Sequence, residues 1–161
     1  MLNEREALGH YLAAQRHHII GAIEGLTDEQ LRQPVLPSGW NCLQMVNHLT
    51  WDVENFWFQC VVAGDLSGFD ITDDGWILPP DATRESVLAA YHRECQRADE
   101  IIATRDLDSA PVWWPVEIFP EMPEQCLRET VLHVIAETAA HAGHLDAVRE
   151  LIDQRQWLVQ A

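Results

Sequence analysis

Four long stretches of the chain repeat apolar residues at intervals of three and four, the spacing that places them on one face of an α-helix. We expect helices over about residues 3–25, 41–63, 83–103 and 127–153. No stretch alternates apolar and polar residues between hairpin turns, so strands are not expected. Four helices of about 20 residues each predict an all-α protein with the fold of a four-helix bundle.

The segments between these helices differ in length and composition. Thr27 and Gln30 have the spacing of a capping box, which predicts a short helical turn at 27–31. Residues 64–82 are rich in Gly, Asp and Pro, and residues 105–126 contain four prolines. Connections this long within a compact domain are often functional. The chain of 161 residues is expected to form one domain, over residues 1–161.

Charge and hydropathy exclude several classes of function. The formal net charge is −16, and the ten basic residues, all arginine, are scattered, so nucleic-acid binding is not expected. No apolar run approaches the roughly 20 residues of a membrane span, and the charged start MLNEREALGHYLAAQ does not resemble a signal peptide. We expect a cytoplasmic protein without membrane contact. The four cysteines are too far apart for a CxxC motif and are expected to be buried and reduced.

The sequence HVIAETAAHAGH, at residues 133–144, carries four side chains that can bind metal. On an α-helical wheel with Glu137 at zero, His133 lies about 40° to one side, His141 about 40° to the other, and His144 about 20° away. These side chains point in the same direction as the apolar residues of the predicted helix. A carboxylate among core residues is costly unless its charge is compensated.

Three explanations of this stripe remain open: a bound divalent metal, a hydrogen-bonded polar network, and a solvated helix face. Glu137 and His141 are one turn apart and can reach a single ion, while His144 could replace one of them. Gly143 costs roughly 1 kcal/mol relative to alanine within a helix. Its presence suggests either a close helix contact or room left for a ligand.

A third protein ligand would complete a metal centre with one open position. His48, in the middle of the second predicted helix, is the best candidate. Its wheel position leaves open whether it faces water or a polar cavity between helices. Asp52, one turn further on, could orient the His48 ring. His17 and His18 are weaker candidates, since adjacent side chains point about 100° apart.

Two segments resemble the DinB superfamily, and more narrowly its mostly actinobacterial branch of unknown function. They are GWNCLQMVNHLTWDVENFW at 39–57 and HVIAETAAHAGHLDAVRE at 133–150. The resemblance implies a four-helix bundle with up-down-down-up helix directions. It also implies a metal site with one histidine from the second helix and two ligands one turn apart on the last. Many members have HxxxH in that last pair, whereas the related mycothiol-dependent maleylpyruvate isomerases have ExxxH. The implied ligands here are therefore His48, Glu137 and His141.

The same resemblance implies that the metal activates a low-molecular-weight thiol, such as mycothiol or bacillithiol, for attack on an electrophile. We therefore expect a thiol-dependent transferase or isomerase. The two nitrogens and one oxygen of the implied ligand set suit zinc first and nickel next. His144 or His133 could act as a base or orient a ligand. The alternatives are a binding or stress-response module that binds metal without catalysis, and a metal-dependent hydrolase.

The remaining expectations concern what surrounds the site. The segment WWPVEIFP at 113–120 could form the wall of a pocket or cover the end of the bundle. Arg128 and Arg149 are the cations nearest the stripe in sequence, and neither clearly faces it. The expected partners are a small thiol and an electrophile. Trp51 and Trp57, on different faces of the second helix, leave a homodimer contact open.

Overall fold

The computed structural model describes residues 1–157, and its only regular secondary structure is helical. The helices in chain order are α1 (Glu4–Ile23), α2 (Asp28–Arg32), α3 (Cys42–His48), η1 (Leu49–Val62), α4 (Arg84–Thr104) and α5 (Leu127–Asp153). No strand occurs in the described residues. The prediction of an all-α protein is confirmed.

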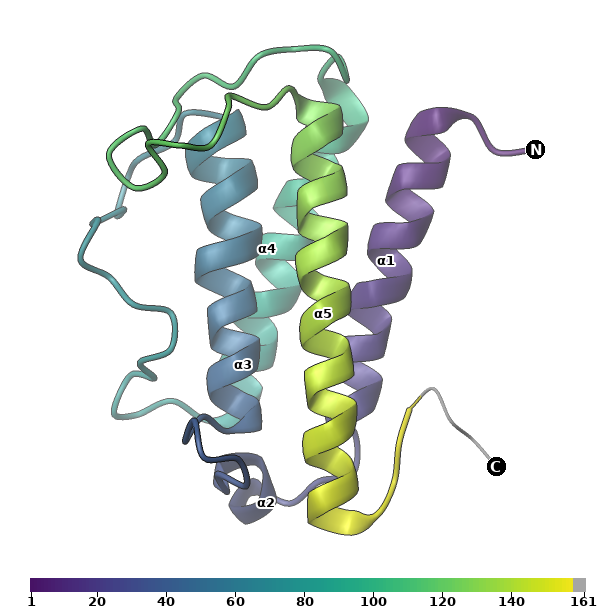
Figure 1. The fold of residues 1–161 in the computed structure, drawn as a ribbon, viewed down its shortest axis with the longest axis vertical. Helices are drawn as coiled ribbons and strands as arrows, with labels where there is room; N and C mark the ends of the chain where they lie inside the picture. The colour runs from purple at the N-terminus through teal and green to yellow at the C-terminus, as the bar shows by residue number, and fades with distance from the viewer. Residues whose placement is uncertain (158–161) are drawn as a thin grey trace.

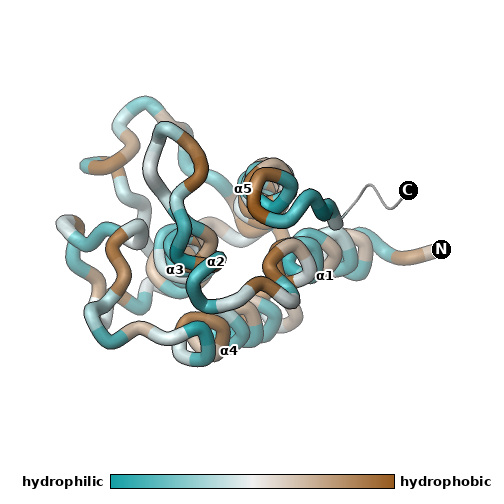
Figure 2. Tube along the Cα trace, turned by 90° about the horizontal axis from the view of Figure 1, so that it is seen from below, coloured by the Kyte–Doolittle hydropathy of each residue, from teal (hydrophilic) through white to brown (hydrophobic). Residues whose placement is uncertain are grey.

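The long helices lie side by side along one axis (Figure 1). α1 and α5 run in one direction, while α3, which continues directly into η1, and α4 run in the other. α5 packs against α1 and η1, and α4 packs against η1 and α3. Figure 2 views these helices end on and shows α2 beside the start of α3. The connection 63–83 returns along the outside of η1 from its end to the start of α4 (Figure 1).

Side-chain caps fix the starts of most helices. Asn3, Thr27, Asn41 and Thr83 each accept a hydrogen bond from the backbone three residues later, and that residue's side chain bonds back to the cap. The predicted short turn at 27–31 is thus present as α2. Gly64 follows η1 with φ of 74°, a conformation that glycine adopts without strain. The predicted helix boundaries agree with the structure to within a few residues.

The second predicted helix differs in its internal geometry. It is α-helical only to His48, and from Leu49 it becomes the π-helix η1, in which hydrogen bonds span five residues. An α-helical wheel, drawn at 100° per residue, therefore does not give the correct side-chain directions beyond His48. Gln59, which that wheel places about 20° from His48, is buried.

Apolar side chains from all the long helices form one core. A buried ion pair crosses it, with Arg16 on α1 donating to both carboxylate oxygens of Glu54 on η1 at 2.7 and 2.6 Å. Burial of the Arg16 guanidinium opposes its ionisation, but the adjacent Glu54 charge outweighs this effect and raises the pKa of Arg16.

Two further sequence predictions can be compared with the fold. All four cysteines are free, and Cys42, Cys60 and Cys95 are buried as expected, whereas Cys126 is half-buried. None of the described helices has both the length and the apolar character needed to cross a bilayer. The domain predicted over residues 1–161 includes 158–161, which lie outside the described residues.

Candidate metal centre

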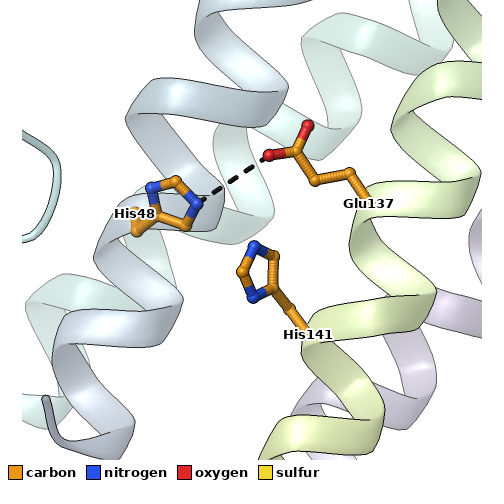
Figure 3. Close-up of side chains that lie close together, drawn as sticks. All are labelled: His48, Glu137 and His141. Carbon is orange, nitrogen blue, oxygen red and sulfur yellow. Dashed lines mark ion pairs between the residues drawn. The ribbon is translucent and has the colours of Figure 1, made fainter. Parts of the chain in front are cut away.

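Three side chains that can bind metal meet between the second and the last long helix. His48 lies at the end of α3, and Glu137 and His141 lie one turn apart on α5 (Figure 3). One potential ligand atom of each residue lies within 4.8 Å of those of the other two. His48 Nε2 lies 4.0 Å from Glu137 Oε1. All three residues are half-buried, so the site is accessible from solvent.

Asp52 fixes the orientation of the His48 ring. His48 Nδ1 lies 2.7 Å from Asp52 Oδ2. Because a carboxylate can only accept, His48 donates its Nδ1 proton, and Nε2 is directed toward Glu137. The side chain of Trp76 stacks on one face of the imidazole ring, with ring centroids 4.3 Å apart and planes 16° from parallel. The ring is therefore held both at its edge and on its face.

The loop segment 74–77 is bound to the polar side of α3 and η1. Gly75 N–H donates to Asp52 Oδ1 and Oδ2 at 3.2 and 3.1 Å. Asn47 donates to the carbonyl of Gly75 at 2.7 Å, and Gln44 donates to that of Trp76 at 2.9 Å. A Cβ at Gly75 would lie 2.4 Å from Asp52 Oδ2, so a larger residue here would force the Asp52 carboxylate to move. Sequence reasoning missed this segment because nothing local marks which glycine of a Gly- and Asp-rich loop makes a contact.

On α5, Glu137 is shared between two histidines. Its Oε2 lies 3.2 Å from His133 Nε2, while its Oε1 faces His48. His144 is exposed, and its Nδ1 lies 3.5 Å from His141 Nδ1. The structure therefore places Glu137 against His48, with His133 and His144 at the edges of the cluster.

The environment of His141 favours the neutral imidazole. Burial is the largest cause, and with the nearby His48 it lowers the pKa of His141 to about 4, while Glu137 acts in the opposite direction. Neutral imidazole is the form of histidine that coordinates a metal.

A comparison with protein families gives a match over nearly the whole chain. The family model described as Mycothiol-S-transferase matches residues 7–154, which include every residue of the cluster. The chain belongs to the mycothiol-S-transferase family. This is a DinB-like family related to mycothiol-dependent enzymes, as the sequence resemblance predicted. The comparisons with curated proteins and with solved structures gave no match.

In this mycothiol-S-transferase family member, the two weaker candidates His17 and His18 lie away from the metal centre. His18 is buried, and its Nε2 lies 2.7 Å from Asp146 Oδ2. The His18 ring also stacks on Trp157, and His17 meets that indole edge on. These contacts join α1 to the segment after α5, which gives His17 and His18 structural neighbours distant from His48.

Gly143 does not provide a close helix contact in this family member. It is exposed, and no atom lies within 4 Å of where its Cβ would be. The explanation by close helix approach is therefore wrong, because the stripe turns outward between His141 and His144. Room beside His141 remains as the second explanation.

The segment 113–120 packs against Trp57 of η1. The rings of Trp114 and Phe119 lie 6.0 and 5.8 Å from that of Trp57 on η1. Trp57 in turn lies 4.5 Å from the His133 ring, which contacts Glu137. The connection is therefore linked to the cluster through Trp57 and His133. Trp57 itself is 2% exposed, which rules it out as a dimer contact.

A cavity of about 730 Å³ lies on another side of η1, under residues 67–79 and against α4. Its lining includes Asp52, Asn47 and Gly75, but none of the three clustered residues. The cavity therefore reaches the residues that support His48 and not the atoms that would bind a metal.

Proposed function

We propose that this protein is a divalent-metal-dependent enzyme that transfers a low-molecular-weight thiol to an electrophile. Mycothiol is the first candidate for this thiol. The convergence of His48, Glu137 and His141 atoms within 4.8 Å is the observation that carries the proposal. The match to the mycothiol-S-transferase family supports the choice of thiol. The donor set could serve metal-dependent chemistry of several kinds, whereas the family match favours transfer of a thiol.

The residues present fit a divalent ion. Two imidazole nitrogens and one carboxylate oxygen are ligands that zinc accepts in catalytic sites, with nickel the next candidate. Neutral histidines and one carboxylate leave such an ion with a net charge of about +1 and an open coordination position. An ion there would lower the pKa of a thiol that enters this position.

The protein groups around the ligands have separate roles in this proposal. Asp52 and Trp76 hold the His48 ring, and His133 Nε2 lies 3.2 Å from the Glu137 oxygen that does not face His48. His144, exposed beside His141, accepts the thiol proton and releases it to solvent. The sulfur then forms a bond to the electrophilic carbon, and the leaving group departs with its electron pair.

The protein's own thiols are not suited to the reaction. Burial raises the pKa of Cys42 and of Cys60 to about 11 and also raises that of Cys95, so these thiols stay protonated at neutral pH. The fourth thiol, Cys126, precedes α5 and lies about 17 Å from Glu137 along the helix at 1.5 Å per residue, so the nucleophile of the proposal is an external thiol.

The remaining predictions belong to the same proposal. We propose that the long helices form one DinB-type four-helix bundle with up-down-down-up directions, which the helix directions in Figure 1 support. The single domain over residues 1–161, the cytoplasmic location and a homodimer also remain proposals.

Metal content is the first measurement. Untagged protein, purified without chelator or nickel resin, should contain about one equivalent of metal by elemental analysis. The variants His48→Ala, Glu137→Ala and His141→Ala should lose it, because each removes one of three ligands. His92→Ala, a change of an exposed histidine on α4, is the control that should retain it. Absence of metal even after reconstitution would show that the cluster is a polar network.

Thiol transfer is the second measurement. The metal-loaded protein should accelerate the disappearance of mycothiol in the presence of an alkylating electrophile, and His144→Gln should slow it by about 10- to 100-fold. Bound metal without thiol consumption would favour a hydrolase, if ester substrates are cleaved, or otherwise a module without catalysis.

A further inference from the structure

We infer that the cavity of about 730 Å³ beside η1 binds a small organic cation, with its charged group among carboxylates and its apolar part against the indole of Trp51. This site is separate from the metal centre, because none of His48, Glu137 and His141 lines the cavity. The inference therefore does not depend on the proposed function. It combines the size of the cavity, one exposed aromatic ring and the charges around it.

The cavity is a space between two helices and the connection that joins them. Residues 67–79 cover it, and side chains of η1 and α4 form its other walls. Asn47 is buried and holds the connection in place, since it donates to the carbonyls of Gly75 and Ile77 at 2.7 and 3.4 Å. A volume of about 730 Å³ lies within the range of roughly 300–1,000 Å³ that small-molecule sites have. The cavity is therefore of a size that suits a small ligand.

Trp51 supplies an exposed aromatic ring to the wall of this cavity. All seven tryptophans lie within residues 1–157, and Trp51 is 39% exposed, whereas the other six are buried or half-buried. Each of those six contacts another aromatic ring, and Trp51 contacts none in the described part of the chain. The face of an indole attracts cations more strongly than that of any other side chain. Phe56 and Phe69, with ring centroids 5.8 Å apart, add apolar surface beside it.

The charged groups around the cavity have a negative balance. Five carboxylates and two guanidiniums line it, which gives a formal charge of −3. Both guanidiniums are paired with Glu94, to which Arg93 and Arg97 each donate at 3.0 Å. The other four carboxylates have no arginine within 4 Å among residues 1–157, and they belong to Asp52, Asp70, Asp73 and Asp74. This field attracts a cation and repels an anion.

The spacing of the carboxylates favours an organic cation over a metal ion. Within residues 1–157, the cluster of His48, Glu137 and His141 is the one group of His, Cys, Asp or Glu in which three ligand atoms lie within 4.8 Å of one another. The carboxylates of the cavity are therefore too far apart for three of them to bind one ion. An ammonium group on an apolar body can lie near such carboxylates while it also rests on an aromatic ring.

Three small phenyl compounds that differ in charge test the inference. At neutral pH 2-phenylethylamine is a cation, 2-phenylethanol is uncharged and 3-phenylpropionate is an anion. Isothermal titration calorimetry at low ionic strength should give a Kd for the amine at least about 10-fold lower than for the alcohol, with the carboxylate binding most weakly. Equal affinity for the amine and the alcohol, or tighter binding of the carboxylate, would overturn the inference. So would the absence of amine binding up to about 10 mM.

Matched variants assign the binding to the cavity. Trp51→Ala should weaken amine binding by about 5- to 10-fold, whereas Tyr11→Ala, which removes an exposed ring from α1, should not change it. Asp73→Asn should weaken it by about 3- to 10-fold, whereas Glu29→Gln, which removes the same charge from the exposed surface of α2, should not. Wild-type affinity in either Trp51→Ala or Asp73→Asn would overturn the inference.

A last variant separates the cavity from the metal centre. His141→Ala changes a clustered residue that does not line the cavity, so the affinity for the amine should equal that of the wild type. Lower affinity in this variant would place the amine at the metal centre and overturn the inference. Metal content and thiol transfer are measured without the amine, so failure of this inference is distinguishable from failure of the proposed function.

Discussion

Gly75 shows how a residue without a side chain can position the candidate metal ligand His48, through its contact with Asp52. The variant Gly75→Ala places a Cβ 2.4 Å from Asp52 Oδ2, so the carboxylate must move away from both Gly75 N–H and His48. We expect metal affinity to fall by about 10- to 100-fold, as when a carboxylate that orients a ligating histidine is lost. Competition with a chromophoric chelator measures this affinity.

The control for this variant is Gly9→Ala on α1, where no atom lies within 4 Å of the added Cβ. Its metal affinity should equal that of the wild type. Wild-type affinity in Gly75→Ala as well would show that the His48 ring is held without Asp52.

The cysteines make a second prediction at the scale of the residue. The thiolate is the reactive form, and burial raises the pKa of Cys42 and Cys60 to about 11. A raised pKa keeps the proton on the thiol, so reactivity increases only as the pH rises toward 11. At pH values near 8, iodoacetamide should modify native protein at the half-buried Cys126, and the three buried cysteines only after unfolding. Mass spectrometry of peptides identifies the sites, and rapid modification of native Cys42 would contradict the prediction.

At the scale of the helix, Gly143 has a measurable cost. It lies inside α5, is exposed, and has open space around it. Gly143→Ala should therefore raise the free energy of unfolding by about 0.5–1 kcal/mol, because alanine loses less backbone entropy in a helix. Urea denaturation measures the change, with Gly9→Ala as a comparison in α1. A loss of stability would show that the space beside Gly143 is needed by the folded chain.

The buried ion pair between α1 and η1 makes a prediction about two helices. Glu54→Leu alone leaves the Arg16 guanidinium buried beside only the exposed carboxylate of Asp99, and should cost about 3–5 kcal/mol of unfolding free energy. The double variant Arg16→Met, Glu54→Leu should recover much of this loss, because it removes both buried charges. Denaturant unfolding of the two variants provides the comparison, and a double variant less stable than the single one would contradict it.

At the scale of the whole molecule, a metal at the cluster would join α3 to α5. A ligand that binds only the folded state raises its stability, by about 2.7 kcal/mol at a free concentration 100 times Kd. Zinc should therefore raise the Tm of the metal-free protein, and chelator should reverse the rise. His141→Ala should show no such response. An equal increase in this variant would locate the binding elsewhere.

The features that local sequence determined are those whose interacting residues lie within one or two helical turns. The caps at Asn3, Thr27 and Thr83 join residues three apart, and the helices were predicted to within a few residues for this reason. The proximity of Glu137 and His141 likewise follows from the helical repeat alone. The switch to a π-helix at Leu49 has no comparable local signal and was missed.

What only the tertiary structure decided involves residues distant in sequence. The helical wheel is compatible with His48 facing either water or the interior, and its role as a ligand is implied only by the resemblance to DinB proteins. Packing of α3 and η1 beside α5 places His48 against Glu137, which lies 89 residues later in the sequence. The return of the 63–83 connection along η1 brings Gly75 to Asp52 and Trp76 to His48. Helix formation depends on neighbouring residues, whereas these contacts depend on how the helices and their connections pack, and no local pattern encodes that.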